Sequence, residues 1–419
     1  MKTIKIKNLL SIDNYRFDIT CQNIFKNFVC EDIDGSSLVA FPAVIDPHVH
    51  FRTPGHEHKE SWKFAAFPAI LGGVTTVFDM PNNSPFISSI SQLSMKHSLI
   101  ENQLKEADIP LRYKLFLGAT ACNFHDIEMI NYYKQICCGI KVFLGNSTGA
   151  SFLSYSILDR IFRIAAELNL VVAVHAEDEE IIRKKQSCMG AKDWTQINAH
   201  SLSRPREAAI KAVDHVIELS HKHGTKVHIL HVSTEEELKL IKEGKKTNKT
   251  IFAEAALPHL FFDEEDYISL GNCIKVNPPV RNKLDREALW EAINSGLIDT
   301  VGSDHAPHLI YEKQVSIEKA PSGIPGNPFL FPLILNAVNE GLLIKERVTK
   351  ITHDVIVDLY DLEETQDFVL VDMKKEHKIE ERDIKSLCKW SPFLGKSIKG
   401  WPMYVILKGT LYPGLGVYL

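Results

Sequence analysis

From about residue 44 onwards, short apolar runs alternate with longer amphipathic stretches along the chain. Apolar positions at intervals of three and four predict helices, for example over residues 154–168, 206–223 and 285–294. The short apolar runs predict strands that are buried on both faces. Eight such strands are expected, at residues 44–50, 74–79, 111–117, 139–143, 171–175, 226–231, 250–253 and 300–303.

Strands that alternate with crossover helices predict parallel β/α units, and eight of them predict an α/β fold of the TIM (β/α)8 barrel type. The alternative is a doubly wound sheet, which needs a glycine-rich first turn. The first turn here carries histidines instead, in the run IDPHVH at residues 45–50. Two further stretches, residues 178–205 and 305–326, are predicted to be long loops, and loops of that length in a compact domain are usually functional or mobile.

The two ends of the chain follow a different pattern. Before residue 44 there are only short alternating pieces, too few to close a core alone. Near the C-terminus, strand-like runs at residues 368–372 and 403–407 are separated by a polar, turn-rich stretch. We expect both ends to pair as one small β domain. The expected division is residues 1–43 and 346–419 for the small β domain and residues 44–345 for the barrel.

Composition narrows the class of protein. The chain has 419 residues, of which 45% are hydrophobic and 24% charged, as is ordinary for a soluble globular protein. A net charge of −5 without a basic stripe gives no reason to expect nucleic acid as a partner. The absence of a long apolar run or an N-terminal signal argues against a membrane protein. The eight cysteines are scattered, which indicates reduced thiols in a cytoplasmic protein.

The candidate chemistry begins with His48 and His50. In an extended segment this spacing points both imidazoles to the same side, where they could bind a zinc-like metal. The alternative is a pair of structural histidines that hydrogen-bond nearby carbonyls. Arg52, two residues further on, favours the functional interpretation, because a guanidinium beside a metal suits the binding of a substrate carboxylate.

Further polar residues stand at the carboxyl ends of other predicted strands, where a barrel of this type gathers its chemistry. Each has a structural explanation when it is taken singly, but their shared position favours one site. They are Lys141 in the fourth strand, His175 and His231 at the ends of the fifth and sixth, and Asp304 after the eighth.

Lys141 needs a separate account, because a protonated ammonium cannot bind a metal. Burial near positive charge depresses the pKa of a lysine, and the neutral amine can react with carbon dioxide to form a carbamate. This anion has two oxygens and can bridge two metals. Asp304 would bind one metal and act as general base on a bridging hydroxide.

Several longer motifs resemble the dihydroorotases of the cyclic amidohydrolase family, over about residues 42–345 and more weakly into the C-terminal strands. The resemblance implies a distorted TIM barrel with a small β-sandwich made from both termini, which agrees with the pattern above. The motifs are HVHFRTPG (48–55) followed by Lys59 and Glu60, GVTTVFDMPN (73–82), KVNPPVR (275–281), SDHAPH (303–308) and APSGIPG (320–326).

The resemblance also implies roles for single residues. It implies two Zn2+ ions bridged by a carboxylated Lys141, with Asp304 as the catalytic acid and base. The implied metal ligands are His48, His50, Lys141, His175, His231 and Asp304. The implied substrate ligands are His50, Arg52, Asn82, Asn277, His308, Ser322 and Gly323.

The activity that the resemblance implies is the reversible hydrolysis of L-dihydroorotate to N-carbamoyl-L-aspartate in pyrimidine biosynthesis. One alternative keeps the metal centre and changes the substrate, as in allantoinase or in hydantoinase (dihydropyrimidinase). Another is an inactive barrel that serves as a scaffold, although inactive relatives typically lose ligands and this chain retains the set. The expected partners are a small-molecule substrate, a second copy in a homodimer and, as a possible association, aspartate transcarbamoylase.

Overall fold

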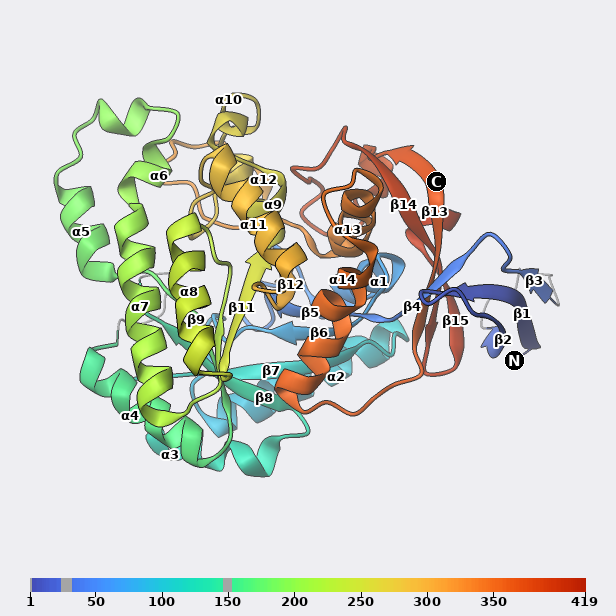
Figure 1. Cartoon of the computed structure of the whole chain (residues 1–419), viewed down its shortest axis with the longest axis horizontal. Helices are drawn as coiled ribbons and strands as arrows, with labels where there is room; N and C mark the ends of the chain where they lie inside the picture. The colour runs from blue at the N-terminus through green and yellow to red at the C-terminus, as the bar shows by residue number, and fades with distance from the viewer. Residues whose placement is uncertain (1, 24–31, 146–152) are drawn as a thin grey trace.

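Eight parallel strands follow one another in sequence order and curl into a barrel. In the computed structural model, which describes residues 2–23, 32–145 and 153–419, helices surround these strands (Figure 1). The first and last strands meet where Val49 bridges His305 and where His50 N donates to His305 O at 2.8 Å. The strands are β5 (Val44–Val49), β6 (Val74–Asp79), β7 (Arg112–Gly118), β8 (Cys137–Phe143), β9 (Val171–His175), β10 (Val227–Ile229), β11 (Ile251–Ala256) and β12 (Thr300–Gly302).

Helices connect the barrel strands and cover their outer side (Figure 1). Local sequence signals set several of their ends. One helix begins at Thr234, which forms a capping box with Glu237, and another ends at Gly224, whose φ of 72° suits glycine. The helices are α1 (Trp62–Leu71), α2 (Ile90–Ala107), α3 (Phe124–Met129), α4 (Tyr155–Glu167), α5 (Glu179–Ser187), α6 (Ala199–Ser203), α7 (Arg206–His223), α8 (Glu235–Thr247), α9 (Leu257–Phe261), α10 (Tyr267–Leu270), α11 (Lys283–Ser295), α12 (Ile310–Lys313), α13 (Leu330–Asn339), α14 (Lys345–Thr349) and α15 (Val355–Tyr360).

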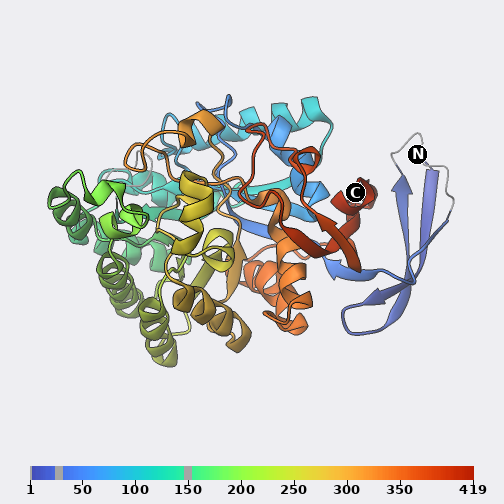
Figure 2. The ribbon, with the colours of Figure 1, turned by 90° about the horizontal axis from the view of Figure 1, so that it is seen from above.

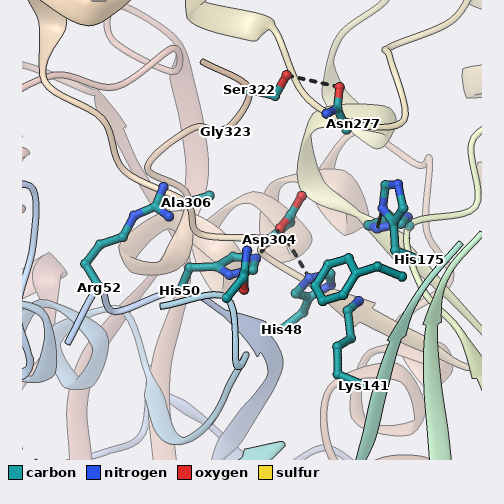
Figure 3. Close-up of a pocket in the computed structure, with 13 residues that line it drawn as sticks. His48, His50, Arg52, Lys141, His175, Asn277, Asp304, Ala306, Ser322 and Gly323 are labelled. Carbon is teal, nitrogen blue, oxygen red and sulfur yellow. Dashed lines mark hydrogen bonds and ion pairs between the residues drawn. The ribbon is translucent and has the colours of Figure 1, made fainter. Parts of the chain in front are cut away.

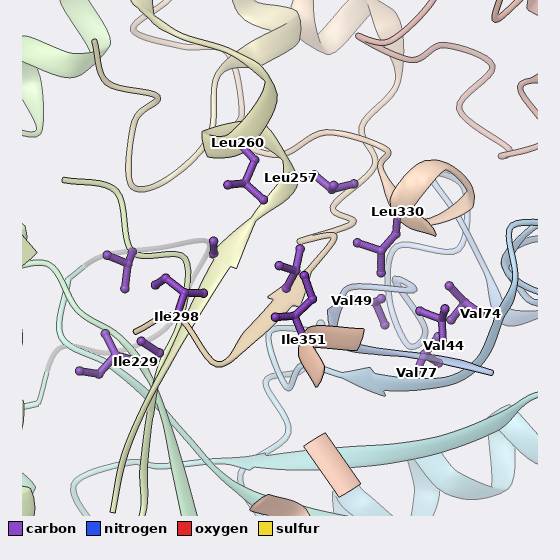
Figure 4. Packing of buried hydrophobic residues seen from close by; sticks show 14 of the residues in the cluster. Val44, Val49, Val74, Val77, Ile229, Leu257, Leu260, Ile298, Leu330 and Ile351 are labelled. Carbon is purple, nitrogen blue, oxygen red and sulfur yellow. The ribbon is translucent and has the colours of Figure 1, made fainter. Parts of the chain in front are cut away.

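The main hydrophobic core lies between the strands and the helices that cover them. Val44 and Val77 of neighbouring strands share one buried cluster with Leu330 of α13 (Figure 4). A second cluster joins the strands to α15, where the ring of Tyr360 lies 4.9 Å from that of Phe78. Burial of both faces explains why the strands read as continuous apolar runs in the sequence.

Strands from both ends of the chain form a second, mixed sheet of seven strands in the order β2-β15-β14-β13-β4-β1-β3. β2 pairs with β1 as well as with β15, so the sheet closes on itself. Both termini lie on this side of the molecule (Figure 1), and the N-terminal strands project away from the barrel (Figure 2). The strands are β1 (Lys2–Ser11), β2 (Arg16–Asn23), β3 (Asp32–Asp34), β4 (Val39–Pro42), β13 (Phe368–Lys378), β14 (Ser397–Leu407) and β15 (Thr410–Pro413).

The predicted architecture, a (β/α)8 barrel with a small β domain from both termini, is confirmed, and each of the eight predicted strands has an observed counterpart. The proposed boundaries at residues 43 and 345 stay a prediction. Within the part of the chain that the structure describes, none of the helices combines the length and apolar character that crossing a membrane requires.

Two local predictions are wrong. Residues 178–205 do not form a plain loop, because α5 and α6 lie within them and the side chain of Asp178 caps α5 by accepting from Ile181 N at 3.0 Å. The polar stretch between the two C-terminal strands also contributes strand. β13 and β14 extend into it as a hydrogen-bonded pair, and their polar side chains alternate between solvent and the sheet.

Candidate metal centre and active site

The ends of β5 and β12 bring three possible metal ligands together at the carboxyl end of the barrel (Figure 3). His48 Nε2 lies 3.3 Å and His50 Nε2 lies 3.2 Å from Asp304 Oδ1. All three side chains are buried, and one ligand atom from each lies within 4.8 Å of the others. Two imidazoles and a carboxylate at one point form a donor set that suits a divalent ion such as zinc.

A second pair of ligand atoms comes from β9 and from the segment after β10. His175 Nδ1 lies 3.0 Å from His231 Nε2, with both rings buried. Burial lowers the pKa of both imidazoles, and each is lowered further by neighbouring positive groups. A low pKa favours the neutral imidazole, which is the form that binds a metal.

Lys141 projects from β8 toward His48 and His175 (Figure 3). Its side chain is only 1% exposed, and its Nζ lies 4.8 Å from the centre of the Phe143 ring. Burial lowers the pKa of Lys141 to about 7, although the carboxylates of Glu254 and Asp304 favour the charged form. A substantial fraction of neutral amine near neutral pH is the condition that carboxylation requires.

Asp304 is held as an ionised carboxylate. Burial alone would raise its pKa, but His48, His50 and Lys141 outweigh this effect and lower the pKa to about 2. Its backbone φ is 46°, in the left-handed region, and the same holds for Arg52 at 65° and His231 at 40°. Such backbone strain in residues other than glycine is concentrated at functional sites.

Two buried glutamates that we did not predict stand behind the histidines. Glu254 Oε1 lies 2.8 Å from His48 Nδ1 and also accepts from His231 N at 3.3 Å. Glu177 Oε2 lies 3.0 Å from His175 Nε2. A carboxylate in this place fixes the tautomer and the orientation of a metal-binding imidazole. The available signal was a glutamate within an otherwise apolar run (IFAEAA, residues 251–256) and one two residues after His175.

Arg52 lies on another side of the pocket from His175 of β9 (Figure 3). Its guanidinium is 5% exposed, donates to Pro307 O at 3.0 Å and lies 3.1 Å from His308 Nε2. Burial lowers the pKa of Arg52 to about 10, so the group remains charged at neutral pH. Lys59 Nζ, 3.1 Å from His308 Nδ1, fixes the other side of this imidazole.

The far wall of the pocket is formed by two loops. Ser322 Oγ donates to Asn277 Oδ1 at 3.0 Å (Figure 3), and His308 Nε2 lies 3.1 Å from Ser322 O. All the predicted site residues except His308 line this pocket, and His308 lies behind Arg52. The lining residues are His48, His50, Arg52, Asn82, Lys141, Phe143, His175, His231, Asn277, Asp304, Ala306, Ser322 and Gly323, of which Phe143 and Ala306 were not predicted.

A parallel barrel with a buried His-His-Asp group at the carboxyl ends of its strands is typical of the amidohydrolases. The model of the amidohydrolase family matches residues 39–352, and the chain belongs to this family of hydrolases.

Similar proteins refine this assignment. The chain is 34% identical to a dihydroorotase of Halobacterium salinarum, over 88% of this chain and 85% of that protein. It is 30% identical to a dihydroorotase of Bacillus cytotoxicus, over 93% and 91% of the two chains. Among solved structures, an L-hydantoinase (dihydropyrimidinase) from Arthrobacter aurescens matches with a TM-score of 0.90 at 26% identity, covering 99% of this chain and 96% of its own. A dihydropyrimidinase from Brevibacillus agri has the same fold, with a TM-score of 0.86 at 22% identity, covering 98% and 95%.

Proposed function

We propose that the protein is a dihydroorotase, which reversibly hydrolyses L-dihydroorotate to N-carbamoyl-L-aspartate in pyrimidine biosynthesis. The similarity to two dihydroorotases over most of their length supports this proposal. The structural likeness to a hydantoinase supports the same ring-opening chemistry on a related cyclic amide.

The observation that carries the choice of substrate is the environment of Arg52. The guanidinium is buried beside the proposed metal site, and among the described residues no carboxylate forms an ion pair with it. The carboxylates of Asp304, Asp79 and Glu312 favour the charged form of Arg52 from a distance but do not pair with it directly. A buried charge without a counter-charge in contact is costly, so such a group suits a site that receives an anionic ligand. Dihydroorotate carries a ring carboxylate, which a guanidinium can bind through two hydrogen bonds. Dihydrouracil and simple hydantoins lack this carboxylate.

We further propose that the pocket holds two zinc ions. His48, His50 and Asp304 would hold one ion, and His175 and His231 would hold the other. The neutral amine of Lys141 would add to carbon dioxide and lose a proton, and the resulting carbamate would supply two further ligand oxygens. Bound in this way, the ions would supply an activated water molecule and polarise the ring carbonyl.

The protein's own groups would carry the remaining steps. Arg52, with Asn82, Asn277 and the backbone near Gly323, would bind the substrate so that its ring amide faces Asp304. Asp304 accepts a proton from the water that attacks the amide carbon. As the carbon–nitrogen bond breaks, the same carboxyl group returns the proton to the departing ring nitrogen. His50 and Ser322 would complete the contacts to the substrate. A direct contact from His308 stays a prediction, because His308 contacts Arg52 and does not line the pocket.

A second candidate function is hydantoinase or dihydropyrimidinase activity, which the high TM-score to the L-hydantoinase favours. Allantoinase activity would use the same centre. These alternatives share the proposed metal ligands but give Arg52 no carboxylate to bind. The inactive-scaffold alternative is weaker, because the candidate ligands lie together in one pocket.

A side-by-side assay distinguishes these functions. The zinc-loaded protein should hydrolyse dihydroorotate with a kcat/KM far above its values for allantoin and dihydrouracil. A higher value for either of the other two would contradict the proposal. Homodimer formation, association with aspartate transcarbamoylase and a cytoplasmic location stay predictions, and the first is testable by the mass of the purified protein in solution.

A further inference from the structure

The long segment after β9 contains a buried ion pair that the proposed chemistry does not use. Arg204 Nε lies 3.1 and 3.0 Å from the two carboxylate oxygens of Glu177, and its Nη2 donates to Oε2 at 2.5 Å. Glu177 is fully buried and Arg204 is 6% exposed. A two-pronged contact of this kind fixes the orientation of a carboxylate as well as its charge.

The Oε2 atom of Glu177, which accepts two hydrogen bonds from Arg204, also faces a candidate metal ligand. Glu177 Oε2 lies 3.0 Å from His175 Nε2. On the opposite side of the same ring, His175 Nδ1 points toward His231 Nε2 at 3.0 Å. The orientation of the imidazole, and therefore the direction of Nδ1, depends on where Glu177 is held.

Arg204 is itself held at a fixed place by the loop that carries Asn277. It follows α6, and its carbonyl oxygen accepts from Arg281 Nη1 at 2.8 Å. In α6, His200 Nε2 donates to Val276 O at 2.8 Å. The segment is thus joined through these contacts to the substrate-side loop, which gives Arg204 a rigid base.

We propose that Arg204 is a positioning residue that acts through Glu177 to aim His175 at the second metal ion. This role rests on the proposed two-metal site. Without the guanidinium, Glu177 would be a buried carboxylate that has lost its two-pronged contact, and it would no longer be held in one orientation. His175 would then lose the partner that fixes its tautomer, while His48, His50 and Asp304 would keep their own arrangement.

The test is a zinc titration of the metal-free protein with a competing chelator, followed for Arg204→Met and Arg204→Lys. We expect the first ion to bind as in the wild type and the second to bind roughly 10–100-fold more weakly, the usual effect of removing a partner of a metal-binding histidine. Arg204→Lys keeps the charge without the fork and should be intermediate. Arg204→Lys also provides the test if Arg204→Met does not fold.

Arg206→Met is the matched control. Arg206 lies two positions further on and pairs with the carboxylates of Glu236 and Asp285. Among the described contacts, neither of these carboxylates pairs with a candidate metal ligand. Loss of the Arg206 side chain should leave both zinc affinities unchanged. Glu177→Gln should weaken binding of the second zinc ion as Arg204→Met does. The double variant should bind this ion no more weakly than either single variant, because both substitutions act through one contact.

The outcomes separate this role from the proposed function. Two ions bound with wild-type affinity in Arg204→Met would overturn the role of Arg204 and leave the two-metal site standing. A wild-type protein that binds a single ion would contradict the two-metal site, and the role of Arg204 with it. Equal losses of zinc affinity in Arg206→Met and Arg204→Met would mean that the effect comes from reduced stability of the protein. This result would also overturn the proposed role of Arg204.

Discussion

The chemistry of Lys141 depends on where β8 places it. An exposed lysine is protonated at neutral pH and cannot react with carbon dioxide, whereas burial lowers the pKa of this one to about 7. Lys141→Ala should therefore lose most activity and at least one of the two proposed metal ions. Added short-chain carboxylic acids should restore part of the activity by filling the gap. Metal analysis that finds about one ion or none in fully active wild-type protein would contradict the two-metal site.

The proposed role of Asp304 as general acid and base can be tested without changing the size of its side chain. The variant Asp304→Asn keeps the volume and one ligand oxygen but cannot take a proton. We expect kcat to fall by roughly two to four orders of magnitude, the usual contribution of a general acid–base group. Steady-state kinetics with the metal content measured in the same sample check this. Near-normal turnover would mean that another residue carries the proton.

For single residues, the sequence predicted those that line the site but not those that hold them in place. His48, His175 and Asp304 could be found because strand ends gather at one end of a barrel and because family motifs contain them. Glu177 and Glu254 were missed. Their places in the sequence suggest buried carboxylates, but their role depends on which ring nitrogen of a histidine faces away from the pocket. That choice is made by tertiary packing, which no local pattern records.

Among the elements, the barrel strands were predictable and the sheet at the chain ends was less so. A barrel strand buried on both faces, such as β9, reads as an apolar run. β13 and β14 are apolar over part of their length and alternate where they meet solvent, so only the apolar parts were predicted. α5 and α6 were missed because both are short and α5 is mostly polar, which resembles a loop in sequence.

The closing strand β12 ends at a glycine that packs against the metal site. A Cβ at Gly302 would lie 2.8 Å from Glu254 Oε2 and 3.0 Å from His48 Cβ. Gly302→Ala should displace both side chains, lower the free energy of unfolding by about 1–3 kcal/mol and weaken zinc binding. Thermal unfolding and zinc titration measure the two effects.

Gly190→Ala is the control, because its Cβ would meet nothing closer than 3.8 Å, and it should change neither the stability nor the zinc affinity. Unaltered zinc affinity in Gly302→Ala would contradict the packing argument.

At the scale of the whole molecule, the C-terminal segment reaches back over the barrel to support the substrate side of the site. The indole of Trp390 donates to His308 O at 2.7 Å. Nearby, Leu387 N donates to the carboxylate of Glu60 at 3.1 Å. The C-terminal segment is therefore joined to the barrel at the loops that follow β5 and β12.

The buried Glu60 should make this junction sensitive to pH. Burial raises its pKa from 4.5 to about 7, so between these values the folded state binds more protons than the unfolded state and stability falls as the pH rises. The full effect is on the order of 3 kcal/mol. Glu60→Gln stays neutral, so its melting temperature relative to that of the wild type should rise between pH 5 and pH 8. A constant difference across this range would show that Glu60 does not titrate there.

The most direct test of the proposed function compares two substrates in one variant. Dihydroorotate differs from dihydrouracil mainly by the ring carboxylate that Arg52 is proposed to bind. For Arg52→Ala, kcat/KM for dihydroorotate should fall by roughly 30-fold to 5,000-fold, because a buried guanidinium–carboxylate contact contributes roughly 2–5 kcal/mol. Arg52→Lys, which keeps the charge without the fork, should also be substantially impaired. The value for dihydrouracil should change little, and equal losses on both substrates would contradict the account.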